Sequence, residues 1–199
     1  MALDCFPQTV ALRGGAPVTL TPLQPADSGA LLAFYGALPE EDRQFLRDDV
    51  TSPEWAAGFL RKVEHQDLLS LIARQGNRVV GEGTLYRSGH GWTRHVGELR
   101  VAVDASLRRK GLGTALASAL VRLATDLGIE KLIIELVDNQ LGARRTFEKL
   151  GFHREATLPH HVMDSIGVKR DLLIMANDVS QIWAAMEALN QDYAPHFTE

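Results

Sequence analysis

The segment "RRKGLGTA", residues 108–115, decides the fold, because it places dense positive charge and flexible backbone directly before a helix. Three consecutive cations are followed by two glycines that flank a leucine, and an apolar stripe at helical spacing then runs to Gly128. A helix N-terminus exposes unpaired N–H groups and partial positive charge, and preceding glycines let those groups converge on one anion. The segment therefore predicts a phosphate or pyrophosphate site at the start of this helix.

Two common phosphate-binding patterns fit the segment poorly. A Walker A loop ends in Gly-Lys-Ser or Gly-Lys-Thr, and this sequence contains neither. A dinucleotide-binding turn has a third glycine, where Leu116 stands here, and it follows its strand directly, whereas several residues separate Val103 from Gly111. The segment alone also leaves open that the glycines only shape the helix start while the cations form a solvated patch.

The rest of the chain alternates between strand and helix patterns. Period-two and buried apolar runs predict strands at 17–23, 68–74, 79–87, 95–103, 131–137, 152–158 and 168–176. Caps and helical spacing predict helices at 25–38, within 40–49, and at 51–63, 112–127, 141–150 and 180–191. Hairpins that alternate with helical crossovers indicate an α/β or α+β protein.

Length and composition narrow the class of protein. The 199 residues suggest one domain, at 16–177, preceded by a flexible arm at 1–15 and followed by a helical extension at 178–199. The net charge of -4 argues against a non-specific nucleic-acid binder. A single cysteine, Cys5, excludes an intrachain disulfide and a cysteine metal cluster. No apolar run reaches membrane-spanning length and the start lacks signal-peptide features, so we expect a cytoplasmic protein without membrane partners.

Three motifs in order resemble one family. The pattern Arg-x-x-Gly-x-Gly at 108–113 resembles the acyl-CoA pyrophosphate loop of the GNAT superfamily of N-acyltransferases. The segment "DNQLGARRTFEKLGF" (138–152) is similar to that family's Asn…Ala…Phe/Tyr-Glu-Lys-x-Gly-Phe motif, and "GVKRDLLIMA" (167–176) is similar to its Gly-x-x-x-Asp…Met strand end. The resemblance covers about residues 16–177 and is most specific from 95 to 152.

The resemblance implies both a fold and a binding mode. The fold would be α/β (α+β), a mixed, mostly antiparallel central sheet with splayed strands 4 and 5, helices on both faces and an extra C-terminal helix. Strands 4 and 5 would be 95–103 and 131–137, and acetyl-CoA would enter between them as acyl-donor co-substrate. The residues then implied in binding it are Leu99, Val101 and Val103 along the pantetheine, Arg108, Arg109, Lys110, Gly111, Leu112, Gly113 and Thr114 at the pyrophosphate, and Asn139 at the pantetheine.

The resemblance also implies a reaction, in which a primary amine attacks the thioester directly in a ternary complex. A backbone N–H near Val101 would stabilise the developing oxyanion. An amine attacks only when neutral, and Glu98 is the first candidate for the base that takes its proton, with Glu82 and Asp49 as alternatives. Glu98 lies about one residue from the family's usual acidic position, and it also fits an outward-facing strand residue.

The sequence departs from the family pattern at Phe147, where members often have a tyrosine that protonates the leaving thiolate. Phenylalanine has no proton to give, but a thiol with a pKa of about 8.5 leaves tolerably as thiolate. Tyr35 or Tyr86 would replace the missing acid only if the fold brought one near the sulfur. Phe147 also supports an alternative function, a regulatory domain that binds acyl-CoA as a sensor and catalyses little.

The resemblance implies an acceptor site between residues 40–49 and the turn at 158–165. The acidic residues Glu40, Glu41, Asp48 and Asp49 either attract a cationic amine or form a solvated helix face. Two histidines and an aspartate in the predicted turn form a base, a metal site or a surface cluster, and no metal is expected because further ligands are absent at metal spacing. These three residues are His160, His161 and Asp164.

The partners implied are acetyl-CoA and an amine acceptor, either a small molecule or a protein amino group. A homodimer is a further possibility, because the final helix has an apolar face with Ile182, Trp183 and Met186. That face either covers the core of this chain or meets a second subunit.

Overall fold

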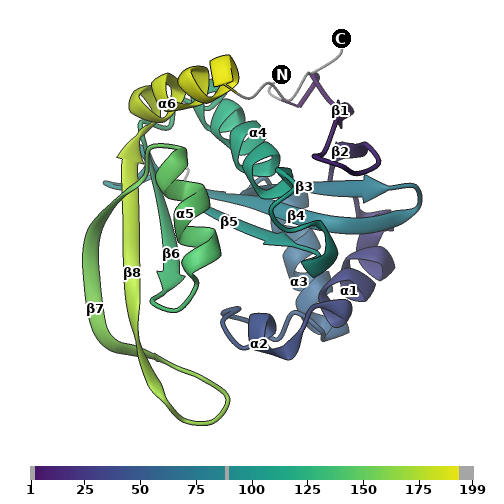
Figure 1. The fold of residues 1–199 in the computed structure, drawn as a ribbon. Helices are drawn as coiled ribbons and strands as arrows, with labels where there is room; N and C mark the ends of the chain where they lie inside the picture. The colour runs from purple at the N-terminus through teal and green to yellow at the C-terminus, as the bar shows by residue number, and fades with distance from the viewer. Residues whose placement is uncertain (1–2, 88–89, 193–199) are drawn as a thin grey trace.

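A computed structural model describes residues 3–87 and 90–192 and contains one eight-stranded sheet (Figure 1). The strands are β1 (Gln8–Val10), β2 (Val18–Pro22), β3 (Leu68–Gln75), β4 (Arg78–Arg87), β5 (Val96–Val103), β6 (Lys131–Val137), β7 (His153–Met163) and β8 (Lys169–Asp178). Their order in the sheet is β1-β2-β3-β4-β5-β6-β8-β7. Neighbours are antiparallel except β5 and β6, which run parallel. The predicted mixed, mostly antiparallel sheet is therefore confirmed.

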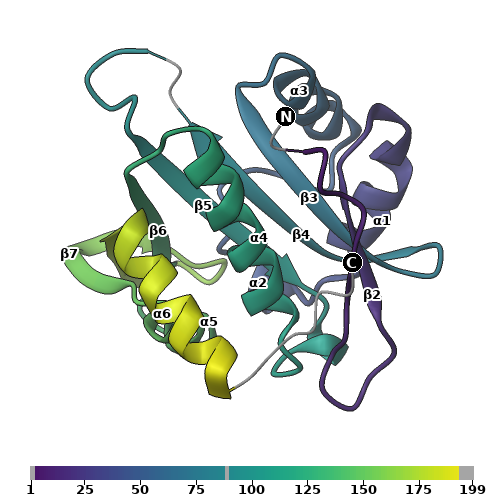
Figure 2. The same ribbon diagram turned by 90° about the horizontal axis from the view of Figure 1, so that it is seen from above.

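Helices cover both faces of this sheet (Figure 2). They are η1 (Pro25–Asp27), α1 (Ser28–Ala37), α2 (Glu40–Arg43), α3 (Pro53–Glu64), η2 (Ala105–Leu107), α4 (Leu112–Asp126), α5 (Leu141–Lys149) and α6 (Val179–Asp192). One core cluster joins α1 and α3 to the sheet, and a larger one joins α4, α5 and α6 to its other face. No helix in the described ranges is long and apolar enough to cross a membrane.

Local sequence signals account for the main helix boundaries. The Ser52 hydroxyl accepts a hydrogen bond from the Trp55 N–H at 3.0 Å, and Pro53 is the first residue of α3.

The helix α4 lies close against β4 because Gly83 has no side chain: a Cβ there would lie 3.0 Å from Leu120 Cδ1. The alternating faces of β4 and β5 then fix which side chains meet α4 and which face α1 and α3.

The N-terminal segment and β7 differ from the sequence-based expectation. Residues 1–15 were expected as a flexible arm, whereas Gln8–Val10 forms the edge strand β1, and Val10 pairs with Val18 and is buried. Three residues are too few to show a period of two. His160 and His161 lie within β7, not in a loop, because β7 continues past an irregularity between Leu158 and Val162.

The helix α6 packs on the core of its own chain. Ile182 and Met186 are buried in the larger core cluster. The Trp183 indole N–H donates a hydrogen bond of 2.7 Å to the Thr125 hydroxyl on α4. The apolar face of α6 therefore packs against α4 and the sheet.

Candidate functional site

The sheet is open between β5 and β6. These strands pair only at Val96↔Lys131, Gly97↔Leu132 and Glu98↔Ile133. Beyond that point β5 continues along β4 and β6 continues along β8, so, within these fully described strands, 99–103 and 134–137 have no ladder partner across the gap. The side chains at 100–103 stay half-buried although the strand is central. Unpaired edge groups of this kind can hydrogen-bond an extended polar ligand.

The start of α4 follows this opening and carries free N–H groups. Arg109 (φ 60°) and Gly111 (φ 95°) adopt left-handed conformations that turn the chain into the helix. The first α4 hydrogen bond runs from the Ala115 N–H to the Gly111 carbonyl at 2.9 Å, and the N-cap residue, Gly111, has no side chain that could cap the helix. The N–H groups of residues 112–114 therefore lie outside the helical ladder, which makes this terminus suited to an anion.

Two of the three cations of this loop, Arg108 and Lys110, contact other segments of the chain. Arg108 forms an ion pair with Asp42 on α2, so its charge is directed toward that helix. The carbonyl of Lys110 accepts a hydrogen bond from the Arg13 N–H at 3.1 Å, and Gly15 packs near the Lys110 side chain. The segment after β1 thus supports the loop, a role that sequence reasoning missed because it treated residues 1–15 as an arm.

Asp104 anchors the turn between β5 and the loop. Its Oδ1 accepts hydrogen bonds from the Ser106 N–H at 2.9 Å and the Ser106 hydroxyl at 2.6 Å, and Arg78 pairs with its other oxygen. Burial opposes ionisation of this carboxyl, but these bonds and the charges of Arg78 and Arg108 lower its pKa overall. The turn is therefore held by an ionised carboxylate.

Glu98 lies at the last paired position before β5 and β6 separate. Its Oε1 accepts a hydrogen bond of 2.9 Å from the Arg100 Nε–H and lies 3.8 Å from the Arg47 Nη2. Arg47 also forms an ion pair with Glu135 on β6. The sequence gives no local signal for Arg47 or Glu135, because these residues meet Glu98 only through the sheet and the α2–α3 connection.

The two other candidate bases are already engaged. Glu82 is 2% exposed, and its carboxyl accepts hydrogen bonds from the hydroxyls of Tyr35, Ser70 and Thr84. Burial raises its pKa, and its side chain is enclosed between α1 and the sheet. Asp49 accepts hydrogen bonds from the Thr51 hydroxyl at 2.7 Å and the Thr51 N–H at 3.2 Å, and these lower its pKa. The Asp49 carboxylate therefore stabilises the turn before α3.

The aromatic candidates are placed as follows. Phe147 is 6% exposed and packs edge-on against Phe152, with ring centroids 5.3 Å apart. The Tyr35 hydroxyl donates to Glu82, and burial raises the pKa of Tyr35 above its usual value. Burial also raises the pKa of Tyr86 to about 12, although the Arg100 guanidinium, 4.3 Å from its ring centroid, opposes the shift. Both phenols therefore stay protonated at neutral pH.

Asn139 lies in the turn between β6 and α5. The residue is exposed, and its backbone carbonyl accepts a hydrogen bond from the Leu141 N–H at 2.9 Å. The neighbouring Gln140 side chain accepts a hydrogen bond from the Val137 N–H at 2.8 Å and ends the strand. This arrangement places Asn139 shortly after β6, at the end of that strand that is not paired with β5.

The β7–β8 turn meets α2 on the side of the sheet opposite α4. The Ser165 N–H and hydroxyl donate to the Gln44 Oε1 at 3.2 and 3.0 Å. Asp164 is buried and accepts hydrogen bonds from Ile166 N–H, Val168 N–H and Arg170 Nε–H at 3.2, 2.8 and 3.3 Å. Asp164 thus shapes the turn.

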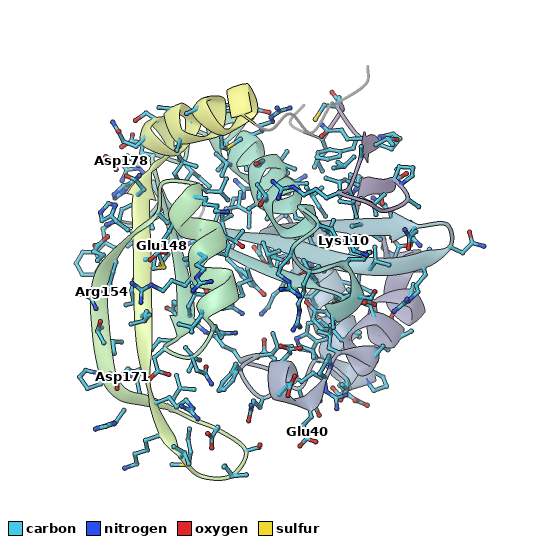
Figure 3. All side chains as sticks on the ribbon, in the orientation of Figure 1. Glu40, Lys110, Glu148, Arg154, Asp171 and Asp178 are labelled. Carbon is cyan, nitrogen blue, oxygen red and sulfur yellow. The ribbon has the colours of Figure 1, made fainter. Side chains whose placement is uncertain are left out.

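His160 and the acidic helix α2 give no sign of a metal centre. The His160 N–H donates to Asp171 Oδ1 at 2.9 Å. Glu40 and Glu41 are exposed, and Figure 3 shows Glu40 at the outer side of α2. Within 3–87 and 90–192, no group of three or more His, Cys, Asp or Glu side chains is arranged to hold a metal ion.

Solved structures with this architecture include several that are described as acetyltransferases. A ribosomal-protein-alanine N-acetyltransferase from Brucella melitensis has a TM-score of 0.71 at 24% identity, covering 80% of this chain and 98% of the other. RimJ from Mycobacterium smegmatis, in complex with CoA-disulfide, has a TM-score of 0.72 at 20% identity, covering 93% and 96%. A putative acetyltransferase from Salmonella typhimurium with acetyl-CoA has a TM-score of 0.72 at 19% identity, covering 82% and 95%.

A family model gives the assignment that these distant structures cannot give alone. No curated protein sequence matches the chain significantly. The model of the acetyltransferase (GNAT) family matches residues 33–152, more than half of the chain. This span contains the open β5–β6 pair, the glycine loop and the start of α4. The chain therefore belongs to the GNAT family of acetyltransferases.

Proposed function

We propose that the protein transfers an acetyl group from acetyl-CoA to a primary amine. The observation that carries this proposal is the opening between β5 and β6 beside the uncapped, cation-flanked start of α4. An extended pantetheine arm and a pyrophosphate need these two features side by side. The acetyl-CoA and CoA-disulfide named for two of the structural neighbours support the same ligand.

The proposed binding mode assigns each part of acetyl-CoA to residues of this chain. The N–H groups of Leu112, Gly113 and Thr114 hold the pyrophosphate, and Arg109 and Lys110 add charge. The backbone of β5 at 99–103 pairs with the pantetheine, and Asn139 hydrogen-bonds it from the other side of the gap. This places the thioester where β5 and β6 begin to separate.

The proposed chemistry is a direct transfer. The amine nitrogen forms a bond to the thioester carbonyl carbon, the C–S bond breaks, and CoA leaves as thiolate. The proton lost by the amine passes to Glu98, directly or through a water, and a backbone N–H near Val101 stabilises the oxyanion. The thiolate takes its proton from solvent, because Phe147 cannot supply one. The acceptor is a small-molecule amine or a protein amino group.

A second candidate function is an acyl-CoA sensor with little catalysis. Phe147 favours it, since its ring packs against Phe152 and has no proton to give at the position where the family resemblance implies a tyrosine. Binding would then occur without transfer. The two functions predict the same ligand and differ only in turnover.

The first experiment is a thermal-shift titration with acetyl-CoA, CoA, ATP and NAD in parallel. A ligand that binds the native state raises its stability, so we expect shifts with acetyl-CoA and CoA alone. Absence of both shifts would overturn the loop assignment and the proposed function with it. Thiol release from acetyl-CoA in the presence of an amine panel then separates the enzyme, which turns over, from the sensor, which does not.

A further inference from the structure

The guanidinium of Arg47 lies between two carboxylates that come from the two separating strands. Its Nη2 is 3.8 Å from Glu98 Oε1 on β5 and forms an ion pair with Glu135 Oε2 on β6. Glu98 pairs with Ile133, and Glu135 is two residues further along β6, on the same face. The carboxylate pair, Glu98 and Glu135, therefore spans the point where the sheet opens.

The carboxylate pair faces away from α4. Leu99, Leu132 and Ile134 alternate with the paired residues and pack into the core cluster that contains α4. The anion site at the start of α4 and the carboxylate pair thus serve opposite faces of the same opening. A thioester whose phosphates lie at α4 would meet its acceptor from the face where Arg47 stands.

Arg47 is a partner that the structure gives to both members of the carboxylate pair. Glu98 also has a hydrogen bond from Arg100, whereas the buried Glu135 Oε2 is contacted by the Arg47 guanidinium. The Arg47 side chain is 47% exposed and comes from the connection between α2 and α3, whereas the Glu98 and Glu135 side chains are 18% and 20% exposed. A group that replaces Arg47 must therefore itself be a cation.

We propose that the carboxylate pair is the seat for the acceptor's ammonium group and that Arg47 fills this seat until the acceptor displaces it. This inference rests on the proposed function and deepens it. It identifies the acceptor as a cationic primary amine that has no negative group beside its nitrogen. An ammonium group brings three N–H donors, enough to reach both Glu98 and Glu135. Displacing Arg47 weakens the apparent affinity for the amine, as any competing internal state does.

The test that needs no turnover measures thermal shifts with methylammonium chloride, with tetramethylammonium chloride at equal ionic strength as the control that lacks N–H donors. In Arg47→Ala and Arg47→Gln the seat is empty, and we expect methylammonium to raise Tm by about 3 to 6 °C at tenfold its Kd. Wild type should respond less, by about 1 to 3 °C, because methylammonium must displace Arg47, and the double variant Arg47→Ala/Glu135→Gln should not respond. Equal responses in all four proteins, or none in either single variant, would contradict the proposal that the carboxylate pair binds an ammonium group.

The kinetic test uses an amine that the wild type acetylates. Arg47→Ala should lower the KM for the amine by about threefold to tenfold and leave the KM for acetyl-CoA unchanged. Glu135→Gln should raise the amine KM, and Arg43→Ala, on α2, is the matched control that should change neither. An amine KM that rises in Arg47→Ala contradicts the inference. If wild type acetylates no amine, the proposed function fails, while the methylammonium shifts still decide whether the seat exists.

Discussion

The Tyr35 hydroxyl on α1 donates a hydrogen bond of 3.0 Å to Glu82 Oε2 on β4, in the buried layer between helix and sheet. The other carboxyl oxygen accepts from Ser70 at 2.5 Å and from Thr84. A buried carboxyl is tolerated only when its oxygens have such donors. This cluster therefore fixes α1 on the face of the sheet opposite α4.

Replacing Tyr35 with phenylalanine should destabilise the protein by about 1 to 3 kcal/mol, because a buried carboxyl oxygen loses its donor. Urea unfolding of both proteins measures the difference. Tyr86→Phe is the matched control: within the described residues its hydroxyl has one hydrogen bond, from the Arg100 guanidinium at 3.5 Å, so its loss should be smaller. Equal losses in the two variants would mean that the Glu82 bond contributes nothing particular.

Glu82 should also make stability depend on pH. Burial raises its pKa above the ordinary value of 4.5, so the folded state holds the proton more tightly than the unfolded state. Its stabilising contribution is fully present below pH 4.5 and is lost as the pH rises through the raised folded value. Glu82→Gln removes this titration. We expect the stability of wild type relative to Glu82→Gln to fall from pH 4.5 upward, measured by urea unfolding at several pH values; a constant difference would contradict this.

The sequence predicts most of this fold and the residues on one side of the candidate site. The helix after Gly111 was predictable because its apolar stripe is long and a glycine lies at each of its ends. The strands at 95–103 and 131–137 were predictable from their apolar runs. The edge strand β1 was not, because its three residues are held by pairing with β2 and not by their own pattern.

The acceptor side of the site was less predictable for the same physical reason. Glu98 was a candidate from its strand alone. Arg47 and Glu135 join it only because the α2–α3 connection and β6 cross the same opening, and no spacing along the chain encodes that contact. The phosphate side is one continuous segment, and so its residues could be named in advance.

Replacing Gly113 with valine should abolish acetyl-CoA binding while the fold persists. A Cβ at this position would lie 3.7 Å from Val103 Cγ2, an ordinary contact, but it would occupy the space over the free N–H groups. Thermal shift with acetyl-CoA reads out binding, and circular dichroism reads out the fold. Gly29→Val is the matched control, because Gly29 is likewise the second residue of its helix and has no atom within 4 Å of an added Cβ. Wild-type binding by Gly113→Val would show that the loop assignment is wrong.

Replacing Phe147 with tyrosine should raise kcat for amine acetylation, by up to about 10²-fold, the lower range of general acid catalysis. The new hydroxyl would supply the proton that CoA thiolate otherwise takes from water. The KM values should stay near those of wild type. Phe152→Tyr adds a hydroxyl to the other ring of the same pair and should leave kcat unchanged. A kcat that is unaffected by Phe147→Tyr would show that thiolate protonation does not limit the rate.

Replacing Asp42 with asparagine should tighten CoA binding. In the free protein Asp42 on α2 pairs with Arg108, so one of the three loop cations is directed away from the pyrophosphate site. Asparagine removes that competitor and frees Arg108, which should lower the CoA Kd by up to about fivefold, the range of a partly exposed ion pair. The effect should shrink at high salt. Titration calorimetry measures the Kd, with Glu41→Gln as the control that removes an equal charge from the same helix. If Glu41→Gln lowers the Kd as much as Asp42→Asn, long-range charge explains the gain and the ion pair does not restrain Arg108.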